Sequence, residues 1–196
     1  MGKAERTRQF IIETAAPIFN EKGIAATTID DILAATGMAK GGLYGHFESK
    51  EEIANVMVNY LLDKLNDKVT AVVSKEKTAI KKIFAFIDLY KDPINSYIDG
   101  GCPILNFGVE ADDNNPILKQ RLKIQIEEGQ KIFTEIINKG IADGEIAFGI
   151  DAADYALKMF SSLEGGMLVS RVTGSSKYMN SLVRMLKNEL KQYELK

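Results

Sequence analysis

Apolar residues recur at helical spacing along almost the entire chain, and this pattern constrains the fold more than any other feature. One stripe runs from Phe10 to Phe19, and a longer one runs from Ile53 to Val72. No segment alternates apolar and polar residues strictly enough to indicate a β-strand. The sequence therefore predicts an all-α protein.

Capping signals divide the first part of the chain into four helices. The first is expected to end at Gly23, where glycine suits a left-handed cap. The second is expected to begin at Thr28 and to end at Gly37, which can adopt the positive φ of a sharp turn. A third, short helix is expected over residues 39–46, and a long fourth helix over residues 49–73.

Four further helices are expected in the remainder of the chain, each from an apolar stripe of helical period. The stripes fall within residues 80–90, 117–137, 155–167 and 178–190. Between the first two lie KDPINSYIDGGCPI and EADDNNP, which are rich in helix-breaking residues. These two segments predict connections between helices.

Composition and charge exclude several classes of protein. The 196 residues carry a formal net charge of −2, and residues 1–50 hold six basic and six acidic side chains. This balance argues against a protein that coats nucleic acid by bulk positive charge, so any DNA binding must come from individual contacts. We expect neither a membrane span nor a signal peptide. A single cysteine favours the cytoplasm, although pairing across a dimer stays open.

The segment GMAKGGLYGHF, residues 37–47, places four glycines between helical segments. Two short helices joined by a glycine-containing turn describe a helix-turn-helix, whose second helix enters the DNA major groove. Glycine costs about 1 kcal/mol of helix propensity relative to alanine, and Gly41, Gly42 and Gly45 all fall in the helix expected over residues 39–46, the second of the helix-turn-helix. Close approach of the backbone to DNA explains that cost.

Polar and aromatic side chains surround these glycines, and such groups hold phosphate oxygens and set the register on DNA. The candidates for DNA contact, beside the three glycines, are Thr27, Thr28, Met38, Lys40, Tyr44, His46 and Lys50. Lys50 fits equally well as a solvated residue in the first turn of the fourth helix. Leu43 and Phe47 are expected to anchor the motif from its apolar side.

The stretch TTIDDILAATGMAKGGLYGHFESKEEI resembles the helix-turn-helix signature of the TetR family of transcriptional repressors. A threonine, a turn glycine, a Lys-Gly pair, Leu-Tyr, His-Phe and Ser-Lys-Glu recur in this order. The match spans about Arg6 to Ile53, and the family often has larger side chains at the positions of Gly42 and Gly45. The resemblance implies DNA contacts from Thr28, Lys40, Gly41, Tyr44, His46 and Lys50.

The resemblance also implies a two-part organisation and a regulatory function. Residues 1–47 would form the DNA-binding domain, and residues 48–196 a domain for effector binding and dimerisation. Each subunit of a homodimer would read one half of a palindromic operator in double-stranded DNA. A small-molecule effector of unknown identity would shift the helix over residues 49–73 and release the DNA. No cofactor or metal is expected.

The last two helices resemble the pair through which members of the family dimerise. Residues expected at that interface are Met159, Leu163, Gly166, Met167, Met179, Leu182, Val183 and Leu186. Gly166 and its neighbour Gly165 would let helix backbones approach closely, although glycine can equally end or bend a helix.

Aromatic and sulfur-containing side chains are the candidates for an effector pocket, although each also fits a plain core. With one acidic residue, Glu110, they are Phe86, Tyr90, Tyr97, Cys102, Phe107, Met159 and Phe160. The segment GGCPIL around Cys102 resembles one in a branch of the family where a cysteine senses electrophiles or oxidants. A lone cysteine is also typical of a small buried side chain, so both interpretations stay open.

Two functions of other classes remain as alternatives. An enzyme built on the C-terminal helices has little support, because one histidine and one cysteine provide no cluster at metal-ligand spacing. Neither a GxGxxG motif nor a phosphate-binding P-loop occurs. The other alternative is a helical scaffold whose helix-turn-helix reads no DNA. The sequence favours a non-enzymatic, DNA-binding regulator over both.

Overall fold

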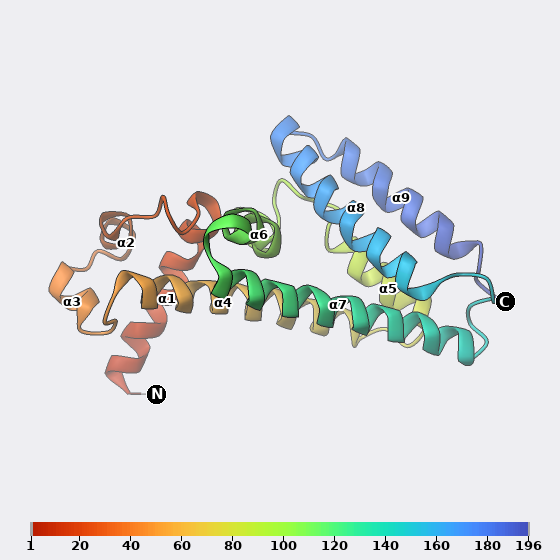
Figure 1. Ribbon diagram of the computed structural model, residues 1–196, viewed down its shortest axis with the longest axis horizontal. Coiled ribbons are helices and arrows are strands. Elements are labelled where there is room, and N and C mark those ends of the chain that lie inside the picture. The colour runs from red at the N-terminus through yellow and green to blue at the C-terminus, as the bar shows by residue number, and fades with distance from the viewer. Residues whose placement is uncertain (1, 196) are drawn as a thin grey trace. The chain divides into compact units, whose positions relative to one another are not determined.

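The computed structural model describes residues 2–195, except for the side chain of residue 114. Nine α-helices follow one another in this part of the chain (Figure 1). Their bounds are α1 Lys3–Lys22, α2 Ile29–Thr36, α3 Lys40–Tyr44, α4 Lys50–Val73, α5 Ala79–Asp88, α6 Pro103–Asn114, α7 Pro116–Ala142, α8 Ala152–Thr173 and α9 Lys177–Lys191. Within residues 2–195, β-pairing is limited to an isolated bridge between Ile146 and Glu194. The prediction of an all-α fold is confirmed.

The helices group into two compact units. The first comprises Met1–Asn66 and Ile98–Leu118, and the second comprises Asp67–Tyr97 and Lys119–Lys196. Helices α1, α2, α3 and α6 belong to the first unit, and α5, α8 and α9 to the second, while α4 and α7 contribute residues to both. These units show which residues pack together and say nothing about what each part does. The predicted division into a DNA-binding domain, residues 1–47, and an effector-binding and dimerisation domain, residues 48–196, therefore stays a prediction.

Local signals place the first helices where the sequence predicts them. The amide of Gly23 donates to the Phe19 carbonyl and closes α1, although its φ of 85° and ψ of 165° differ from the left-handed conformation predicted for this cap. Thr28 caps α2, and Gly37, with a φ of 67°, ends it in the left-handed conformation. Helix α3 is shorter than predicted and ends at Tyr44. Each boundary therefore follows from a cap or a glycine rather than from distant packing.

Helix α6 corrects the sequence analysis, which predicted connections between helices over residues 91–104 and 110–116 and no helix between them. Its sequence PILNFGVEADDN is helical throughout. Pro103 takes the first helical position, where the missing amide hydrogen has no intrahelical partner to lose. Phe107 and Ala111, four residues apart, are buried on one narrow face. Tertiary packing therefore stabilises a helix of low intrinsic propensity.

In the first unit, each helix contributes apolar side chains to a shared core. Fully buried residues from α1, α2, α3, α4 and α6 are Phe19, Ile32, Leu43, Ile53 and Phe107. Helices α2 and α3 have eight and five residues, too few to be stable in isolation. Burial of Ile32 and Leu43 in this core is what stabilises them.

In the second unit, α8 and α9 pack closely against each other. A Cβ atom added to Gly166 of α8 would lie 2.7 Å from Cδ1 of Leu182 on α9, so glycine permits this approach. The hydroxyl of Tyr155 donates to the Leu186 carbonyl at 2.8 Å, and burial raises the pKa of Tyr155. The two helices are thus joined by packing and by a buried hydrogen bond.

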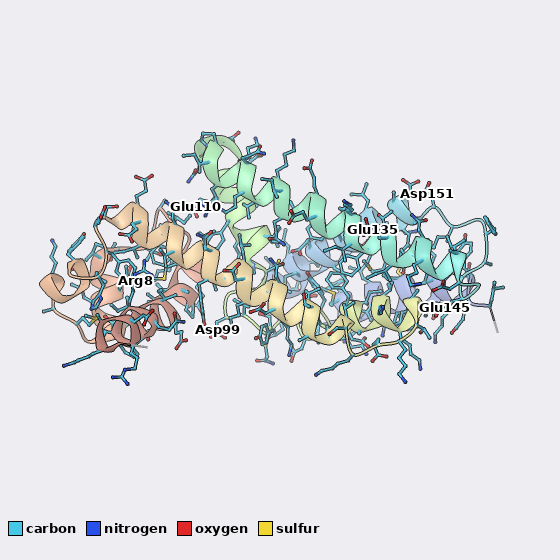
Figure 2. All side chains as sticks on the ribbon, turned by 90° about the horizontal axis from the view of Figure 1, so that it is seen from below. Arg8, Asp99, Glu110, Glu135, Glu145 and Asp151 are labelled. Atoms are coloured by element: carbon cyan, nitrogen blue, oxygen red, sulfur yellow. The ribbon has the colours of Figure 1, made fainter. Side chains whose placement is uncertain are left out.

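The segment after α7 ties three parts of the second unit together. The carboxylate of Glu145, labelled in Figure 2, accepts a hydrogen bond from the Ala79 amide at the start of α5, at 2.6 Å. The Ala147 amide donates to the Tyr193 carbonyl at 2.7 Å, which pairs the segment with the end of the chain.

No helix within residues 2–195 combines the length and the apolar character needed to cross a membrane.

Candidate DNA-binding surface

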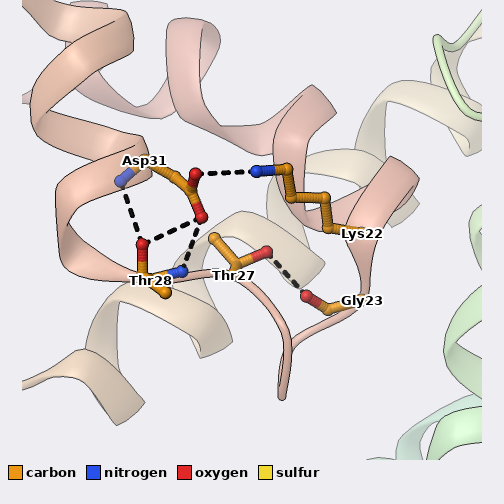
Figure 3. A network of polar contacts seen from close by, with 5 residues as sticks. All are labelled: Lys22, Gly23, Thr27, Thr28 and Asp31. Atoms are coloured by element: carbon orange, nitrogen blue, oxygen red, sulfur yellow. Dashed lines mark hydrogen bonds and ion pairs between the residues drawn. The ribbon is translucent and has the colours of Figure 1, made fainter.

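A network of polar contacts fixes the start of α2 (Figure 3). The Thr28 hydroxyl oxygen accepts a hydrogen bond from the Asp31 amide at 3.1 Å, and the Asp31 carboxylate accepts one from the Thr28 amide at 2.9 Å. At the end of α1, Lys22 Nζ lies 2.7 Å from Asp31 Oδ1. The Lys22 ammonium, and then the Thr28 amide and hydroxyl, lower the pKa of Asp31 to about 2. The ends of α1 and α2 are therefore held together.

The structure corrects one of the predicted DNA contacts, that of Thr27. Its side chain is fully buried, and its hydroxyl donates to the Gly23 carbonyl at 2.6 Å (Figure 3). A side chain that solvent does not reach cannot contact a phosphate, so the predicted contact from Thr27 is wrong. Thr28 is exposed, although its hydroxyl also donates to Asp31 at 2.9 Å.

Helix α3 presents its glycines to solvent. Gly41, Gly42 and Gly45 are all exposed. A Cβ atom added at Gly41 would meet nothing within 4 Å, and one at Gly42 would meet only the flexible end of Met38, at 3.2 Å. Packing within the protein therefore does not require glycine at positions 41 and 42. On the other side of the helix, Leu43 is fully buried.

Helices α1 and α4 hold the end of this motif through Phe47. The Phe47 ring is buried, and the Arg8 guanidinium lies 4.7 Å from its centroid. Arg8, labelled in Figure 2, also forms an ion pair with Glu52 Oε1 at 3.2 Å. The position of α3 is thus fixed from its buried side. We call α1, α2 and α3 with their connections, residues 3–47, the head.

Two lysines beside the motif have no carboxylate partner within residues 2–195. They are Lys40, the exposed first residue of α3, and Lys50, the half-buried first residue of α4. Tyr44 is exposed, while Met38 and His46 are half-buried. The structure therefore brings Lys40, Gly41, Gly42 and Tyr44 to the exposed side of one short helix, with the exposed Gly45 directly after it.

The residues predicted for an effector pocket divide between the two units. Cys102, Phe107 and Glu110 lie in the first, and Phe86, Tyr90, Tyr97, Met159 and Phe160 lie in the second. Phe107 and Met159 are fully buried, whereas Tyr97 is half exposed. Cys102 is buried at the start of α6, which favours the interpretation as a small buried side chain.

An aromatic cluster in the second unit contacts a buried glutamate through one of its members, Tyr90. The rings of Phe86 and Phe133 lie 4.2 Å apart between centroids, and those of Phe86 and Tyr90 lie 5.5 Å apart. The Tyr90 hydroxyl donates to Glu164 Oε1 at 3.2 Å, and Glu164 is only 7% exposed. The sequence analysis missed Phe133 and Glu164. For Glu164, the sequence did offer a signal, because this glutamate follows Leu163 inside an apolar stripe.

Glu110 does not stand free in a pocket. Its two carboxylate oxygens accept hydrogen bonds from the backbone amides of Ile24 and Ala25, at 2.7 and 2.6 Å. Glu110 is labelled in Figure 2. The carboxylate is therefore bonded to the turn after α1, and the predicted part of Glu110 in an effector pocket stays a prediction.

The predicted dimer residues lie inside the subunit. Seven of the eight are buried, and Leu182 is half-buried. Gly166 of α8 lies against Leu182 and Met179 of α9 in the same chain, so these side chains are covered within the subunit. The predicted contact with a partner subunit stays a prediction. The exposed apolar side chains of the two helices are instead Leu157, Leu168, Val169, Val172, Tyr178 and Met185.

Comparisons with known proteins agree with this geometry. The family model of tetR-family bacterial regulatory proteins matches residues 11–57, and that of the tetracycline-repressor-like C-terminal domain matches residues 79–186. The solved structure of a TetR transcriptional regulator from Chloroflexus aurantiacus is 34% identical, covers 99% of this chain and 98% of its own, and has a TM-score of 0.93.

Two further relatives support the same family. A TetR-family regulator structure from Cytophaga hutchinsonii is 33% identical over 100% of this chain and 98% of its own, with a TM-score of 0.87. The transcriptional repressor DhaR of a Mycobacterium species is 25% identical and covers 84% of this chain and 82% of its own. With its exposed glycine helix and these matches, the chain belongs to the TetR family of DNA-binding transcriptional regulators.

Proposed function

We propose that the protein is a dimeric repressor that binds a palindromic operator and is released from it by a small-molecule effector. The exposed glycine side of α3 carries this proposal. Since nothing in the protein requires glycine at 41 or 42, the missing side chains serve an approach from outside, and a DNA groove needs such an approach. The similarity to DhaR, named a repressor, supports repression.

Lys40, Lys50 and Tyr44 supply the principal polar contacts in this proposal. The two ammonium groups, which lack carboxylate partners within residues 2–195, bind phosphates and fix the register of α3. The Tyr44 hydroxyl donates to a phosphate or to a base edge. The remaining proposed contacts are Thr28, Met38, Gly41, Gly42, Gly45 and His46.

The homodimer is proposed to form through the exposed side of α8. Leu157, Leu168 and Val172 repeat along this helix at spacings that keep them near one face. Gly165 is exposed there, and a Cβ atom added to it would meet nothing within 4 Å, so a partner helix can approach it closely. A two-fold dimer presents two heads to half-sites about 34–36 Å apart, or a multiple of that distance.

Effector contact is proposed at the aromatic side chains of the second unit. The cluster of Phe86 and Tyr90 beside the buried Glu164 offers apolar surface and a fixed polar group, the usual combination in ligand sites. An effector that favours the arrangement unable to bind DNA lowers operator affinity. A coupling of about 1–3 kcal/mol corresponds to a decrease of about 5- to 150-fold.

Selection of bound genomic fragments, followed by footprinting, tests the function. The selected duplex is expected to bind at least about 10³-fold more tightly than bulk DNA at physiological salt. The Lys40→Ala variant should bind it more weakly and with a smaller salt dependence, by about 0.9 in the logarithmic slope for each phosphate that the variant no longer neutralises. Lys123→Ala, on an exposed part of α7, is the matched control.

Two outcomes would contradict the proposal. If no fragment binds more than about tenfold better than bulk DNA, the protein is not a sequence-specific regulator, and a partner-binding scaffold becomes the better interpretation. If Lys40→Ala and Lys123→Ala bind the selected duplex as tightly as the wild type, α3 is not the element that contacts DNA.

A further inference from the structure

We infer that Glu110, on α6, is a positioning residue of the head: its carboxylate holds the turn that joins α1 to α2. The two residues that it holds precede it by 86 and 85 positions in the chain. The inference rests on the proposed function only where operator binding is the measured quantity. The bonding itself belongs to the first unit and is independent of DNA.

The backbone amides of the turn show why the carboxylate is needed. The Gly23 amide donates to the Phe19 carbonyl at 2.9 Å, and the Thr27 amide donates to the Gly23 carbonyl at 3.2 Å. The two amides after Gly23, those of Ile24 and Ala25, have no carbonyl partner within residues 2–195 and both donate to Glu110. Two short bonds from adjacent amides to one ionised carboxylate are stronger than neutral hydrogen bonds.

Side-chain packing does not fix this turn by itself. Ile24 is half-buried and Ala25 is exposed. Both face an open hollow of about 380 Å³, whose other walls include Lys50, Ala54, Val58 and Leu118. A turn whose side chains border open space keeps its position mainly through its backbone bonds, so the two bonds to Glu110 carry much of the constraint.

Gly23 is adapted to the carboxylate as well as to the turn. Its φ of 85° favours glycine, and an added Cβ atom would lie 3.0 Å from Oε2 of Glu110. A larger residue would therefore both strain the backbone and press on the carboxylate. The same glycine carbonyl accepts the Thr27 hydroxyl, so the Glu110 bonds, Gly23 and the buried Thr27 form one continuous attachment.

A second attachment joins α6 to the end of α1. The side-chain amide of Asn106 donates to the Asn20 carbonyl at 2.9 Å and to the Gly100 carbonyl at 3.0 Å. The side-chain amide of Asn20 donates to the carbonyls of Asp99, at 2.6 Å, and Gly101, at 3.0 Å. Asp99 is labelled in Figure 2. Asn106 and Glu110 are four residues apart and so lie on one face of α6.

These attachments give α6 a direct effect on the head. Helix α2 begins at Ile29, four residues after Ala25, and its capping residue Thr28 follows the same turn. A displacement of α6 relative to α1 must either break the Glu110 bonds or move the turn with it. The orientation of α2 and α3 therefore depends on α6 as well as on α4.

Amide hydrogen exchange of the full-length protein tests this inference without DNA. In Glu110→Ala, the Ile24 and Ala25 amides should exchange about 10- to 100-fold faster, because each loses a bond to a charged acceptor. In Glu110→Gln, which preserves size, one amide should keep a carbonyl acceptor while the other faces an NH₂ donor. Protection should therefore fall at one of the two amides. A general loss of structure would affect the whole head instead.

Asp113→Asn is the matched control, since it removes the same charge from an exposed position of the same helix. It should leave the protection of Ile24 and Ala25 unchanged. If Glu110→Ala and Glu110→Gln also leave both amides protected, Glu110 does not hold the turn and the inference is wrong. Because Glu110→Gln preserves packing, this result stays decisive even if Glu110→Ala folds poorly.

Operator binding supplies the functional readout. With the duplex selected from genomic fragments, Glu110→Ala should bind about 5- to 50-fold more weakly and remain dimeric. Binding of the duplex should slow exchange in α6 of the wild type and of Asp113→Asn, but not of Glu110→Ala, because coupling is reciprocal. Equal affinity and equal slowing in Glu110→Ala would overturn the positioning role. A wild type that binds no duplex would refute the proposed function, and the exchange of Ile24 and Ala25 would still decide the role of Glu110.

Discussion

Nothing inside the protein requires glycine at position 41. Substitution of Gly41 by alanine should therefore affect stability and DNA binding in opposite directions. Gly41→Ala is expected to raise the free energy of unfolding by about 0.5–1 kcal/mol, because alanine favours a helix and meets no neighbour. The same methyl group should weaken operator binding at least about tenfold by holding the backbone away from DNA. Urea unfolding and fluorescence anisotropy with the selected duplex measure the two effects.

Gly129→Ala provides the control for this pair of effects. Gly129 lies within α7, and a Cβ atom added to it would also meet nothing within 4 Å. It should stabilise the fold by a similar amount and leave the affinity for DNA unchanged. Tight binding by Gly41→Ala would mean that the glycine does not serve backbone approach to DNA.

Asp31 is expected to make stability depend on pH in acid. Its folded pKa of about 2 lies below the ordinary value of 3.8, so ionised Asp31 contributes stability fully above about pH 4. That contribution should decrease as the pH falls from 4 to 2 and the carboxylate takes up a proton. Unfolding by urea, compared between wild type and Asp31→Asn across this range, should show the two stabilities converging. Parallel pH profiles would show that the bonds to Lys22 and Thr28 do not stabilise the fold.

At the scale of the element, α7 contains two glycines whose surroundings differ. A Cβ atom added to Gly140 would lie 2.6 Å from the Cβ of Ala79, which is fixed to the backbone of α5, and 2.8 Å from Cδ1 of Ile146. Gly140→Ala should therefore destabilise the protein by about 1–3 kcal/mol through overpacking. Gly129→Ala in the same helix should stabilise it. Urea unfolding of both variants checks this opposition, and shifts of the same sign would contradict it.

Element boundaries could be predicted where a local signal set them. The cap at Thr28, the left-handed Gly37 and the long stripe of α4 are short-range features, and all three appear as expected. Helix α6 could not be predicted, because its stability comes from the burial of Phe107 and Ala111 against residues distant in sequence. The same reason explains the missed contact between Asn20 and Asn106, which are 86 positions apart.

At the scale of the whole molecule, dimerisation should depend on the outward side of α8. Leu168 is 53% exposed in the subunit, so Leu168→Glu should leave the subunit folded. In a two-fold dimer the change buries two charges, and we expect the dimer to weaken at least about tenfold. Sedimentation velocity and thermal unfolding measure association and folding separately.

Ile132→Glu is the control for dimerisation, because Ile132 on α7 is exposed to the same extent. This variant should stay dimeric. If Leu168→Glu stays dimeric as well, the exposed face of α8 is not the contact between subunits. If the protein is monomeric before any substitution, the proposed arrangement of two heads on one operator fails.

The sequence by itself determined the helical class, most helix boundaries and the family. These depend on periodicity, caps and a motif read within a few residues, where each signal acts on its own neighbourhood. The tertiary structure alone decided which side of each helix is buried. It buried the Thr27 side chain, packed Gly166 of α8 against Leu182 of α9, and bound the Glu110 carboxylate to a turn distant in the sequence. These contacts depend on which surfaces meet across the fold. An apolar stripe of helical period predicts that one face of a helix is buried, but it does not specify which residues bury it.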